Sequence, residues 1–385
     1  MALLFAVLPV FSLFTACNKA TKGNSNALEL HNRPYPLTLH KEKEYRFDLI
    51  TKEGPFIGDT DDKDHIYAYF LQNQDNNCQV FKMNTDLEVE GTYIIRRAAG
   101  PGEAQNPRIY GGDSGGFIIV WDAPAHKYIK FDTNFRLIDE YRLNKQMGTF
   151  MYSGATYITR ENMILDGFLQ YDNYYDGFLR IFTLKITPDK KIKTVKLWET
   201  FKKTHRKDND KYICGDPLNF GYYFDFIYIL EKPHYRLIKM DLSGKIIKDI
   251  RISFKERTFP RDLRKEWIDT FCLDDEYCKR RFDLPEDLWP AVWLIQVGDG
   301  IAVARTDSYA PGPKRPIPAD YFDRDLNYLG KIELPYFEFW NHPNTGQYHA
   351  FIKFLTKNGK LYFLETRADD DYWIIRYGID TKHPL

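Results

Sequence analysis

One short segment has the residue types of a catalytic serine loop. Residues 112–116 read Gly-Asp-Ser-Gly-Gly, and Ser114 would act as a nucleophile only with a histidine base, an orienting aspartate and an oxyanion hole. The histidines that precede it, His31, His40 and His65, stand in no matching context, and too little chain lies before the loop for the first barrel of a protease. Glycine, aspartate and serine are also turn residues. The segment is therefore predicted to be a tight turn between two strands.

An acidic cluster has the oxygen density of a calcium loop. It consists of Asp59, Asp61, Asp62 and Asp64. A helix–loop–helix calcium loop starting at Asp59 would need a glycine where Asp64 stands, and a glutamate where the chain has Phe70. A solvated turn is the better interpretation, and the chain contains no zinc-protease motif, phosphate loop or nucleophile elbow. The sequence thus predicts no metal, no cofactor and no catalytic residue.

The N-terminus predicts export and lipid attachment. Residues 2–14 form an almost wholly apolar run, followed by two small residues and Cys17. The run is shorter than the ~20 residues that span a bilayer, and its arrangement is similar to a bacterial lipoprotein signal. We therefore expect residues 1–16 to be a signal peptide, Cys17 to carry the lipid, and residues 17–36 to be a flexible tether. The alternative is an ordinary secretory signal that contains a cysteine.

Four cysteines remain after the lipid site, namely Cys78, Cys214, Cys272 and Cys278. Export permits disulfides, and Cys272 with Cys278 is the best candidate pair. On a continuous helix the two side chains would face about 240° apart, so a bond needs a helix break, which the two aspartates at residues 274–275 can supply as N-caps. A disulfide between them and a pair of free thiols both stay open.

The absence of net charge bears on binding to nucleic acid and to membrane surfaces. The chain has 385 residues with 54 Lys+Arg and 54 Asp+Glu, and so no net charge. Binding to nucleic acid or to a membrane surface through bulk charge is therefore not expected. The only membrane contact that we expect is the lipid anchor. Aromatic residues make up 16% of the chain, which favours strands.

A repeated pattern must position all of these residues. Five times an apolar residue precedes a turn rich in Asp, Asn, Ser or Thr, and a second apolar residue follows six positions after the first. The first residues are Met83, Phe131, Ile186, Met240 and Phe322, and the second are Val89, Leu137, Ile192, Ile246 and Tyr328. Such a repeat indicates stacked sheet units that share one core. We therefore predict an all-β propeller spanning residues 37–385.

The strand count predicts six blades and one insertion. Five blades have four strands each, the sixth has three, and residues 45–50 supply its fourth strand by pairing with residues 372–377, which leaves no open sheet edge. Between blades four and five, residues 254–289 do not read as strands. Phe259, Leu263, Trp267 and Phe271 are spaced by four, which predicts a helical insertion.

A resemblance accompanies this pattern. Residues 100–109, Gly-Pro-Gly-Glu-Ala-Gln-Asn-Pro-Arg-Ile, with the strand pair that follows, resemble an NHL-type repeat. Over roughly residues 37–380 the chain resembles the six-bladed β-propeller lipoproteins of bacteria. The resemblance implies the fold and an exported, tethered location, and it supplies no catalytic residue.

The predicted connections differ in length at the two ends of the propeller. The long ones share one face, where we expect a protein or small-molecule ligand to bind. The candidate residues on that face are Arg96, Arg97, Trp267, Trp340 and His342. We expect a non-enzymatic binding module in the bacterial envelope, on the outer membrane and facing the periplasm or the cell surface. The alternative is a lyase-like or lactonase-like propeller enzyme with its site at the mouth of the axial channel.

Overall fold

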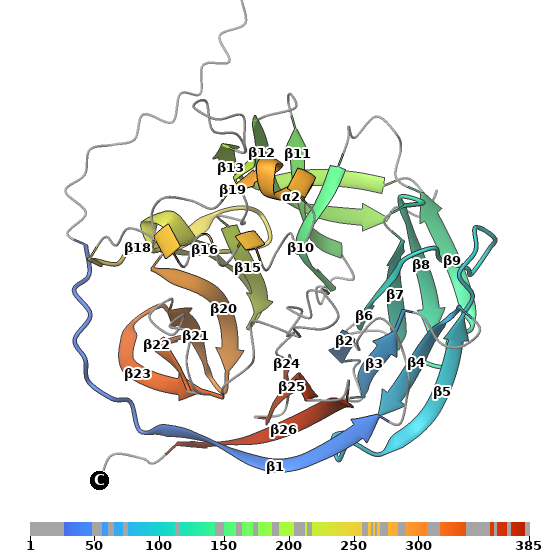
Figure 1. Cartoon of the computed structure of the whole chain (residues 1–385), viewed down its shortest axis with the longest axis horizontal. Coiled ribbons are helices and arrows are strands. Elements are labelled where there is room, and N and C mark those ends of the chain that lie inside the picture. The colour runs from blue at the N-terminus through green and yellow to red at the C-terminus, as the bar shows by residue number, and fades with distance from the viewer. Residues whose placement is uncertain are drawn as a thin grey trace, which may run out of the picture.

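In the part of the chain that the computed structural model describes, six four-stranded antiparallel sheets surround a central axis (Figure 1). Each sheet has one edge strand near the axis and the other on the rim. The structure describes residues 27–47, 56–60, 65–71, 76–111, 116–122, 124–142, 150–158, 164–171, 176–186, 192–203, 212–213, 218–255, 261–262, 265, 268–269, 276–283, 290–305, 316–335, 355–357, 360–367 and 371–381. The arrangement is a β-propeller.

Five sheets are built from consecutive strands. The first contains β2 (Phe56–Thr60), β3 (Ile66–Phe70), β4 (Cys78–Met83) and β5 (Val89–Ile95), and the second contains β6 (Pro107–Gly111), β7 (Phe117–Asp122), β8 (Lys127–Asp132) and β9 (Leu137–Arg142). The third contains β10 (Phe150–Ile158), β11 (Ile164–Tyr171), β12 (Asp176–Ile186) and β13 (Ile192–Lys203). The fourth contains β15 (Leu218–Tyr223), β16 (Phe226–Glu231), β17 (Arg236–Met240) and β18 (Ile246–Arg251). The fifth contains β20 (Ala291–Val297), β21 (Gly300–Arg305), β22 (Ile317–Asp323) and β23 (Tyr328–Leu334).

The second strand of a sheet is the most deeply buried. Every residue of β3, Ile-Tyr-Ala-Tyr-Phe, and of β7, Phe-Ile-Ile-Val-Trp-Asp, is buried. Such continuous apolar runs arise because neighbouring sheets cover both faces of these strands. The rim strands β5, β9 and β18 are instead mostly exposed. The core therefore lies between adjacent sheets, as the hydrophobic clusters that span neighbouring sheets show.

The sixth sheet joins the two ends of the chain. We call it the composite sheet, and its order is β1 (Leu37–Phe47), β26 (Asp371–Thr381), β25 (Lys360–Arg367) and β24 (Leu355–Lys357). The predicted N-terminal pairing is confirmed where the structure describes it, since Tyr45 lies opposite Ile374 and Phe47 opposite Tyr372. The structure thus shows five blades of consecutive strands where six blades were predicted. The remaining place in the ring is taken by a sheet that neither chain end can build alone.

The predicted helical insertion at residues 254–289 is not shown. In the described part of this stretch, residues 261–262, 265 and 268–269 have helical backbone, and the six-residue helix α2 (Glu276–Arg281) leads into the short strand β19 (Phe282–Asp283). β19 pairs in parallel with β14 (Tyr212–Ile213). The four residues predicted to form one helix face, Phe259, Leu263, Trp267 and Phe271, lie outside the described residues. A four-residue spacing indicates helical backbone locally, but packing decides whether it continues.

The register of the sheets confirms the repeat. In every consecutive sheet the first residue of the repeat lies opposite the residue six positions later, and the pairs are Met83–Val89, Phe131–Leu137, Ile186–Ile192, Met240–Ile246 and Phe322–Tyr328. In four of the five, a β-bulge directly precedes the pair. The spacing of six therefore arises because a turn of five residues separates the two residues that close it.

The turn closed by each pair is held by its first polar side chain. Asp132 Oδ1 accepts backbone N–H groups from Asn134 at 2.8 Å and Arg136 at 2.9 Å. Asn84, Asp241 and Asp323 make the same two bonds in their own turns, at 2.8–3.0 Å. Such a side chain satisfies donors that the tight backbone leaves unpaired. The turn of the third sheet, residues 187–191, lies outside the described residues.

The fourth residue of each described turn has a left-handed backbone. Its φ is 59° at Leu87, 57° at Phe135 and 57° at Leu326, and the fourth such position is Gly244. A non-glycine residue pays about 1–2 kcal/mol for this backbone. The side chain offsets that cost because it enters the core between two sheets. Leu87 and Leu326 are 2% and 1% exposed, and burying a leucine contributes about 1.5–3 kcal/mol.

The neighbouring sheet holds the same turn from outside. Tyr362 in β25 donates its hydroxyl proton to the carbonyl oxygen of Thr85 at 3.2 Å, and Tyr228 in β16 does the same to Arg324 at 2.8 Å. These carbonyls occupy equivalent places in the turns of the first and fifth sheets. At two separate contacts between neighbouring sheets, a tyrosine on the second strand of one sheet therefore binds a turn of the next sheet.

The end of the predicted tether contacts the propeller. We call residues 28–35 the strap. Leu28 forms a parallel bridge with Ile252 at the end of β18, and Pro34 forms one with Lys331 in β23. In Figure 1 the strap follows the rim past β18 and β23 before it enters β1. Residues 28–35 therefore bind the edges of two sheets.

Removing the side-chain acceptor of one turn should destabilise the protein measurably. Asp132→Ala leaves the N–H groups of Asn134 and Arg136 without their acceptor, so we expect the free energy of unfolding to fall by about 1–2 kcal/mol. Asp132→Asn keeps the Oδ1 acceptor and reproduces the residue found at Asn84, so its loss should be less than half as large. Urea unfolding of the two variants would measure this, and equal losses would contradict the role assigned to Oδ1.

Candidate functional site

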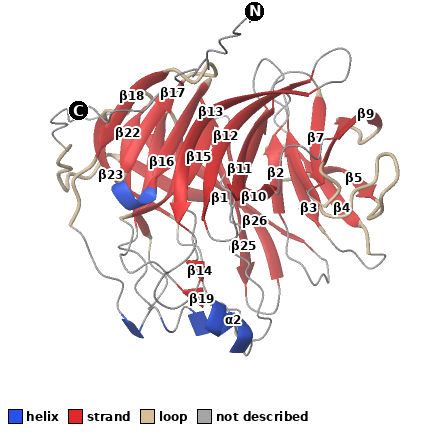
Figure 2. Ribbon diagram, turned by 90° about the horizontal axis from the view of Figure 1, so that it is seen from above, coloured by secondary structure: helices blue, strands red, loops and turns tan. Residues whose placement is uncertain are grey.

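The two ends of the propeller differ in the length of their longest connections. Within an antiparallel sheet, the first and third turns emerge at one end, and the second turn and the link to the next sheet emerge at the other. At the first end the connections are short, for example residues 224–225, 298–299 and 324–327. At the other end they include residues 204–217, 306–316 and 335–354. We call this second end the long-loop face, and Figure 2 shows β14, β19 and α2 projecting from it.

The structure describes two of the five predicted binding residues. Arg96 is exposed on the link between the first and second sheets. Arg97 is half-buried, and its guanidinium donates to the carbonyl oxygen of Gln105 at 2.9 Å and to Asn76 Oδ1 at 3.3 Å. Arg97 therefore holds two loops together. Trp267, Trp340 and His342 lie outside the described residues.

The segment at residues 100–106 is held in place by buried charges. Asp122 accepts the backbone N–H groups of Gln105 at 3.0 Å and Asn106 at 3.1 Å. The fully buried Lys127 donates to the carbonyl oxygen of Gly100 and to Glu140, both at 3.1 Å. Burying an ammonium group is costly unless it is paired and hydrogen-bonded, and these contacts meet that condition. Both buried charges position the loop.

The cysteine predictions fall mostly outside the described residues. Cys17 and Cys272 are not described, and of Cys278 only the backbone in α2 is described. Cys78 is a buried free thiol whose pKa is raised by burial, which makes it unreactive. Ser114 is also outside the described part. Among the residues that are described, no group of three or more His, Cys, Asp and Glu side chains is placed to hold a metal ion.

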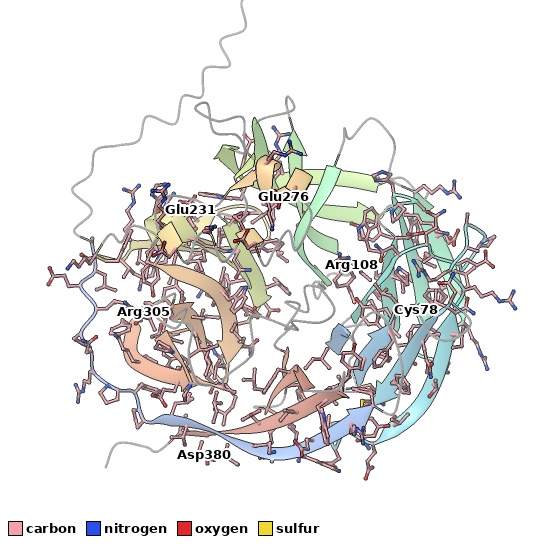
Figure 3. All side chains as sticks on the ribbon, viewed as in Figure 1. Cys78, Arg108, Glu231, Glu276, Arg305 and Asp380 are labelled. Carbon is pink, nitrogen blue, oxygen red and sulfur yellow. The ribbon has the colours of Figure 1, made fainter. Side chains whose placement is uncertain are left out.

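A buried acid lies between the fourth and fifth sheets. Asp320 in β22 is fully buried, and Oδ2 accepts a hydrogen bond from the Tyr235 hydroxyl and an ion pair from Arg305 at 3.4 Å. Oδ1 of the same carboxylate has no hydrogen-bond partner among the described residues. Tyr235 precedes β17 in a left-handed backbone conformation with φ of 41°. Arg305 is the last residue of β21, before the long connection at residues 306–316, and Figure 3 labels it within the fifth sheet.

Burial sets the electrostatics of this cluster. It raises the pKa of the Asp320 carboxyl, while the hydrogen bond from Tyr235 and the charge of Arg305 act in the opposite direction. It also raises the pKa of Tyr235 well above the ordinary value, and the adjacent Asp320 adds to that effect. Tyr235 therefore keeps its proton and donates it to Asp320 in a hydrogen bond. The free acceptor Oδ1 suits a hydroxyl or amine donor.

Only one feature of the sequence points to this cluster. Tyr235 and Asp320 are far apart along the chain and form no local motif. The one signal is a charged residue within the run Ile-Pro-Ala-Asp-Tyr-Phe at residues 317–322, whose other members suit a buried strand. A buried charge in such a run usually has a partner. The identity of that partner depends on how the two sheets face each other.

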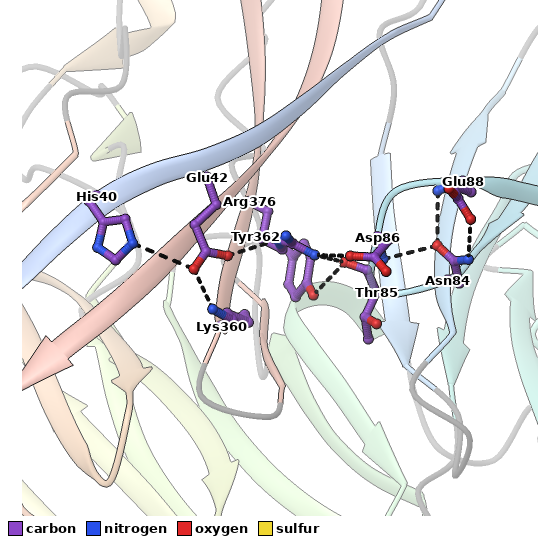
Figure 4. Close-up of polar contacts among 9 residues, drawn as sticks. All are labelled: His40, Glu42, Asn84, Thr85, Asp86, Glu88, Lys360, Tyr362 and Arg376. Atoms are coloured by element: carbon purple, nitrogen blue, oxygen red, sulfur yellow. Dashed lines mark hydrogen bonds and ion pairs between the residues drawn. The ribbon is translucent and has the colours of Figure 1, made fainter.

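A second polar network lies at the opposite end, between the composite sheet and the first sheet (Figure 4). Glu42 is the extra residue of a β-bulge in β1, and it binds Lys360 and, at 3.0 Å, Arg376. Arg376 also pairs with Asp86 at 2.7 Å. His40 lies 3.5 Å from Glu42. We call this group the seam network, because it joins the N-terminal strand, the C-terminal strand and the first sheet.

The seam network lowers the pKa of its carboxylates. A hydrogen bond from Lys360 lowers the pKa of Glu42, and one from Arg376 lowers that of Asp86. A carboxyl whose pKa is lower in the folded state than in the unfolded state stabilises the fold at higher pH. That stabilisation is fully present at a pH above the ordinary pKa, which is 4.5 for Glu42. It is lost as the pH falls through the lowered pKa of the folded state.

Replacing Glu42 by a neutral residue should therefore make the stability of the protein depend less on pH in the acidic range. We expect the melting temperature of the wild type to fall more steeply between about pH 5 and pH 3 than that of Glu42→Gln, because the variant has no proton to take up at this position. The matched control is Glu333→Gln, an exposed residue on β23, which should keep the wild-type slope. Identical slopes for wild type and Glu42→Gln would contradict the role of Glu42 in the seam.

Comparisons with known proteins support the fold and nothing finer. No protein-family model matches the chain, and no curated protein matches it. It is similar in structure to a member of the DUF4221 family from Bacteroides vulgatus, with a TM-score of 0.51 and 11% identity over 91% of this chain and 99% of that one. It is also similar to a protein from Bacteroides fragilis whose name describes it as exported, with a TM-score of 0.50 and 12% identity over 93% and 99% of the two chains. Both likenesses define a β-propeller.

Proposed function

We propose that this chain is a lipid-anchored six-bladed β-propeller of the bacterial envelope, which binds a protein or a small molecule on its long-loop face without catalysing a reaction. The observation that carries the proposal is the difference between the two ends. At the short-turn end the described turns are occupied in holding neighbouring sheets together. The long-loop face has connections that the ring does not need, including β14, β19 and α2. Loops on a rigid scaffold are where binding residues concentrate.

The composite sheet is the sixth blade in this proposal. It has four strands in the same axis-to-rim arrangement as the other sheets, with β24 at one edge and β1 at the other. Tyr362 on its second strand binds the turn of the next sheet as Tyr228 does in the fourth. The NHL-like character belongs to the second sheet, where residues 100–109 precede β7 and β8.

Export and the lipid anchor are supported by the sequence. The support is the apolar run before Cys17, and the Bacteroides fragilis neighbour described as exported shares the fold. No helix in the described part of the chain is long and apolar enough to cross a membrane. The proposal places the anchor at Cys17 in the outer membrane, with the propeller in the periplasm or at the cell surface.

The alternative, an enzyme site at the mouth of the axial channel, gains no support from the buried acid. Asp320 is in β22, the third strand of the fifth sheet, and Tyr235 directly precedes β17, the third strand of the fourth sheet. Both are away from the innermost strands β15 and β20. The cluster thus lies between two blades. Metal analysis of the purified protein would separate the two functions, because a stoichiometric calcium or zinc ion would favour the enzyme.

Replacing Cys17 should release the protein from the membrane. In cells fed an alkyne-labelled fatty acid, we expect the wild type to carry the label and to sediment with membranes. Cys17→Ser should lose the label and become soluble, because no other expected anchor remains. The matched control is Cys78→Ser at a buried position, which should keep both label and location. A labelled Cys17→Ser protein would exclude Cys17 as the attachment site.

Replacing the long connection should abolish binding and spare the fold. When residues 256–287 become a short Gly/Ser linker, the six sheets keep all their strands, so the circular dichroism spectrum and a cooperative melt should be retained. A panel of envelope glycans and peptides would then be screened by thermal shift on both proteins. Any compound that raises the wild-type melting temperature by about 2 °C or more should have no effect on the variant. An equal shift in both would place the binding site elsewhere.

A further inference from the structure

The strap is bound to the rim by main-chain hydrogen bonds at two places. The N–H of Leu28 donates to the carbonyl oxygen of Arg251 at 2.8 Å, and the N–H of Ser253 donates to that of Leu28 at 3.0 Å. The N–H of Tyr35 donates to Lys331 at 2.8 Å, and the N–H of Lys331 donates to Arg33 at 2.8 Å. At both places the strap lies parallel to the outer edge of a rim strand and pairs with it. Backbone pairing of this kind supplies affinity to any extended peptide that can reach it.

Two side chains of the strap determine which peptide fits. Leu30 packs against the hydrophobic cluster between the fourth and fifth sheets, which includes Tyr228 and Phe322. Tyr35 packs against the cluster of the fifth and composite sheets, and its ring lies 5.0 Å from that of Tyr321. The rim edges of β18 and β23 thus form a docking track for an apolar residue followed five positions later by an aromatic one.

Gly330 shows that the track is shaped for an occupant. It lies inside β23 with φ of 145°, and a Cβ atom there would meet the carbonyl oxygen of Arg33 at 2.7 Å. The next nearest atom is Cβ of Tyr35, at 3.1 Å. A glycine weakens the interior of a strand and is often found where another backbone comes close. The close approach of the strap is the reason for a glycine at this position.

The strap also limits what can be added beyond it. Pro34 and Pro36 flank Tyr35 and have no N–H to donate. A further strand therefore cannot pair regularly with the outer side of the strap. Filling the track closes the edge.

We propose that the docking track also accepts this segment in trans, so that residues 27–36 of a second copy of the chain can replace the strap. The contacts are local to the segment, and every feature that the track recognises is present in any copy. In one molecule the resident strap has the advantage, because its link to β1 gives it a high effective concentration. Exchange therefore requires that the resident strap is released or that the second copy is abundant.

The test uses a strap that has been released while the track is left intact. Leu30→Asp with Tyr35→Asp in the full chain removes both apolar contacts, and the probe is a fluorescently labelled synthetic peptide of residues 27–36. We expect fluorescence anisotropy to show that the peptide binds the released variant at least about tenfold more tightly than the wild type. Adding Gly330→Val to the released variant should abolish the binding, because the new side chain occupies the place of the peptide backbone.

Two results would overturn the proposal. One is a released variant with a wild-type circular dichroism spectrum and a cooperative melt that binds the peptide no more tightly than the wild type does. The other is binding that survives Gly330→Val. If the released variant does not fold, the proposal is tested by measuring hydrogen exchange of the wild type in the presence of millimolar peptide. Faster exchange of the Leu28 and Tyr35 amides in the intact chain supports displacement, and unchanged exchange refutes it.

Discussion

The structure depends on one turn, repeated from sheet to sheet, in which an Asp or Asn side chain accepts two backbone N–H groups. The bonds hold the fourth turn residue in a left-handed conformation that its side chain would otherwise disfavour. In three of the four described turns this residue is Leu or Phe, and it packs in the core between two sheets. A local hydrogen-bonding device thus generates the long-range contact that stacks the blades.

The same device explains why the two ends of the propeller differ. At the short-turn end, tyrosine hydroxyls and cations of one sheet bind the turn of the next, as Arg376 binds Asp86 and Lys239 binds Asp325 at 2.6 Å. That end is committed to holding the ring together. The connections at the long-loop face vary in length, and additional elements such as β14, β19 and α2 are found there.

The contact between the fourth and fifth sheets contains a buried polar pair, and the strap covers the rim of the same two sheets. Asp320 and Tyr235 bury a carboxyl group and a hydroxyl group together, and a buried ionisable pair is rarely a net source of stability. The strap crosses the rim of the same two sheets, with Leu30 in their shared cluster and the carbonyl oxygen of His31 accepting a hydrogen bond from Tyr328 at 2.9 Å. The N-terminal segment therefore both completes the composite sheet and covers a neighbouring seam.

The sequence by itself determined the features that depend on local chemistry. Turn residues and the six-residue spacing located the repeat, because an Asp or Asn cap, a left-handed residue and a bulge need that many positions. Counting strands also predicted that β1 would pair with the C-terminal strand. The sequence could not show that Arg97 would be used between two loops, that Asp320 would meet Tyr235, or that residues 28–35 would bind the rim. The helical spacing after residue 254 likewise did not establish a helical insertion. Those outcomes depend on which surfaces the closed ring brings together, and backbone preference carries no information about surfaces that meet only after the sheets have packed.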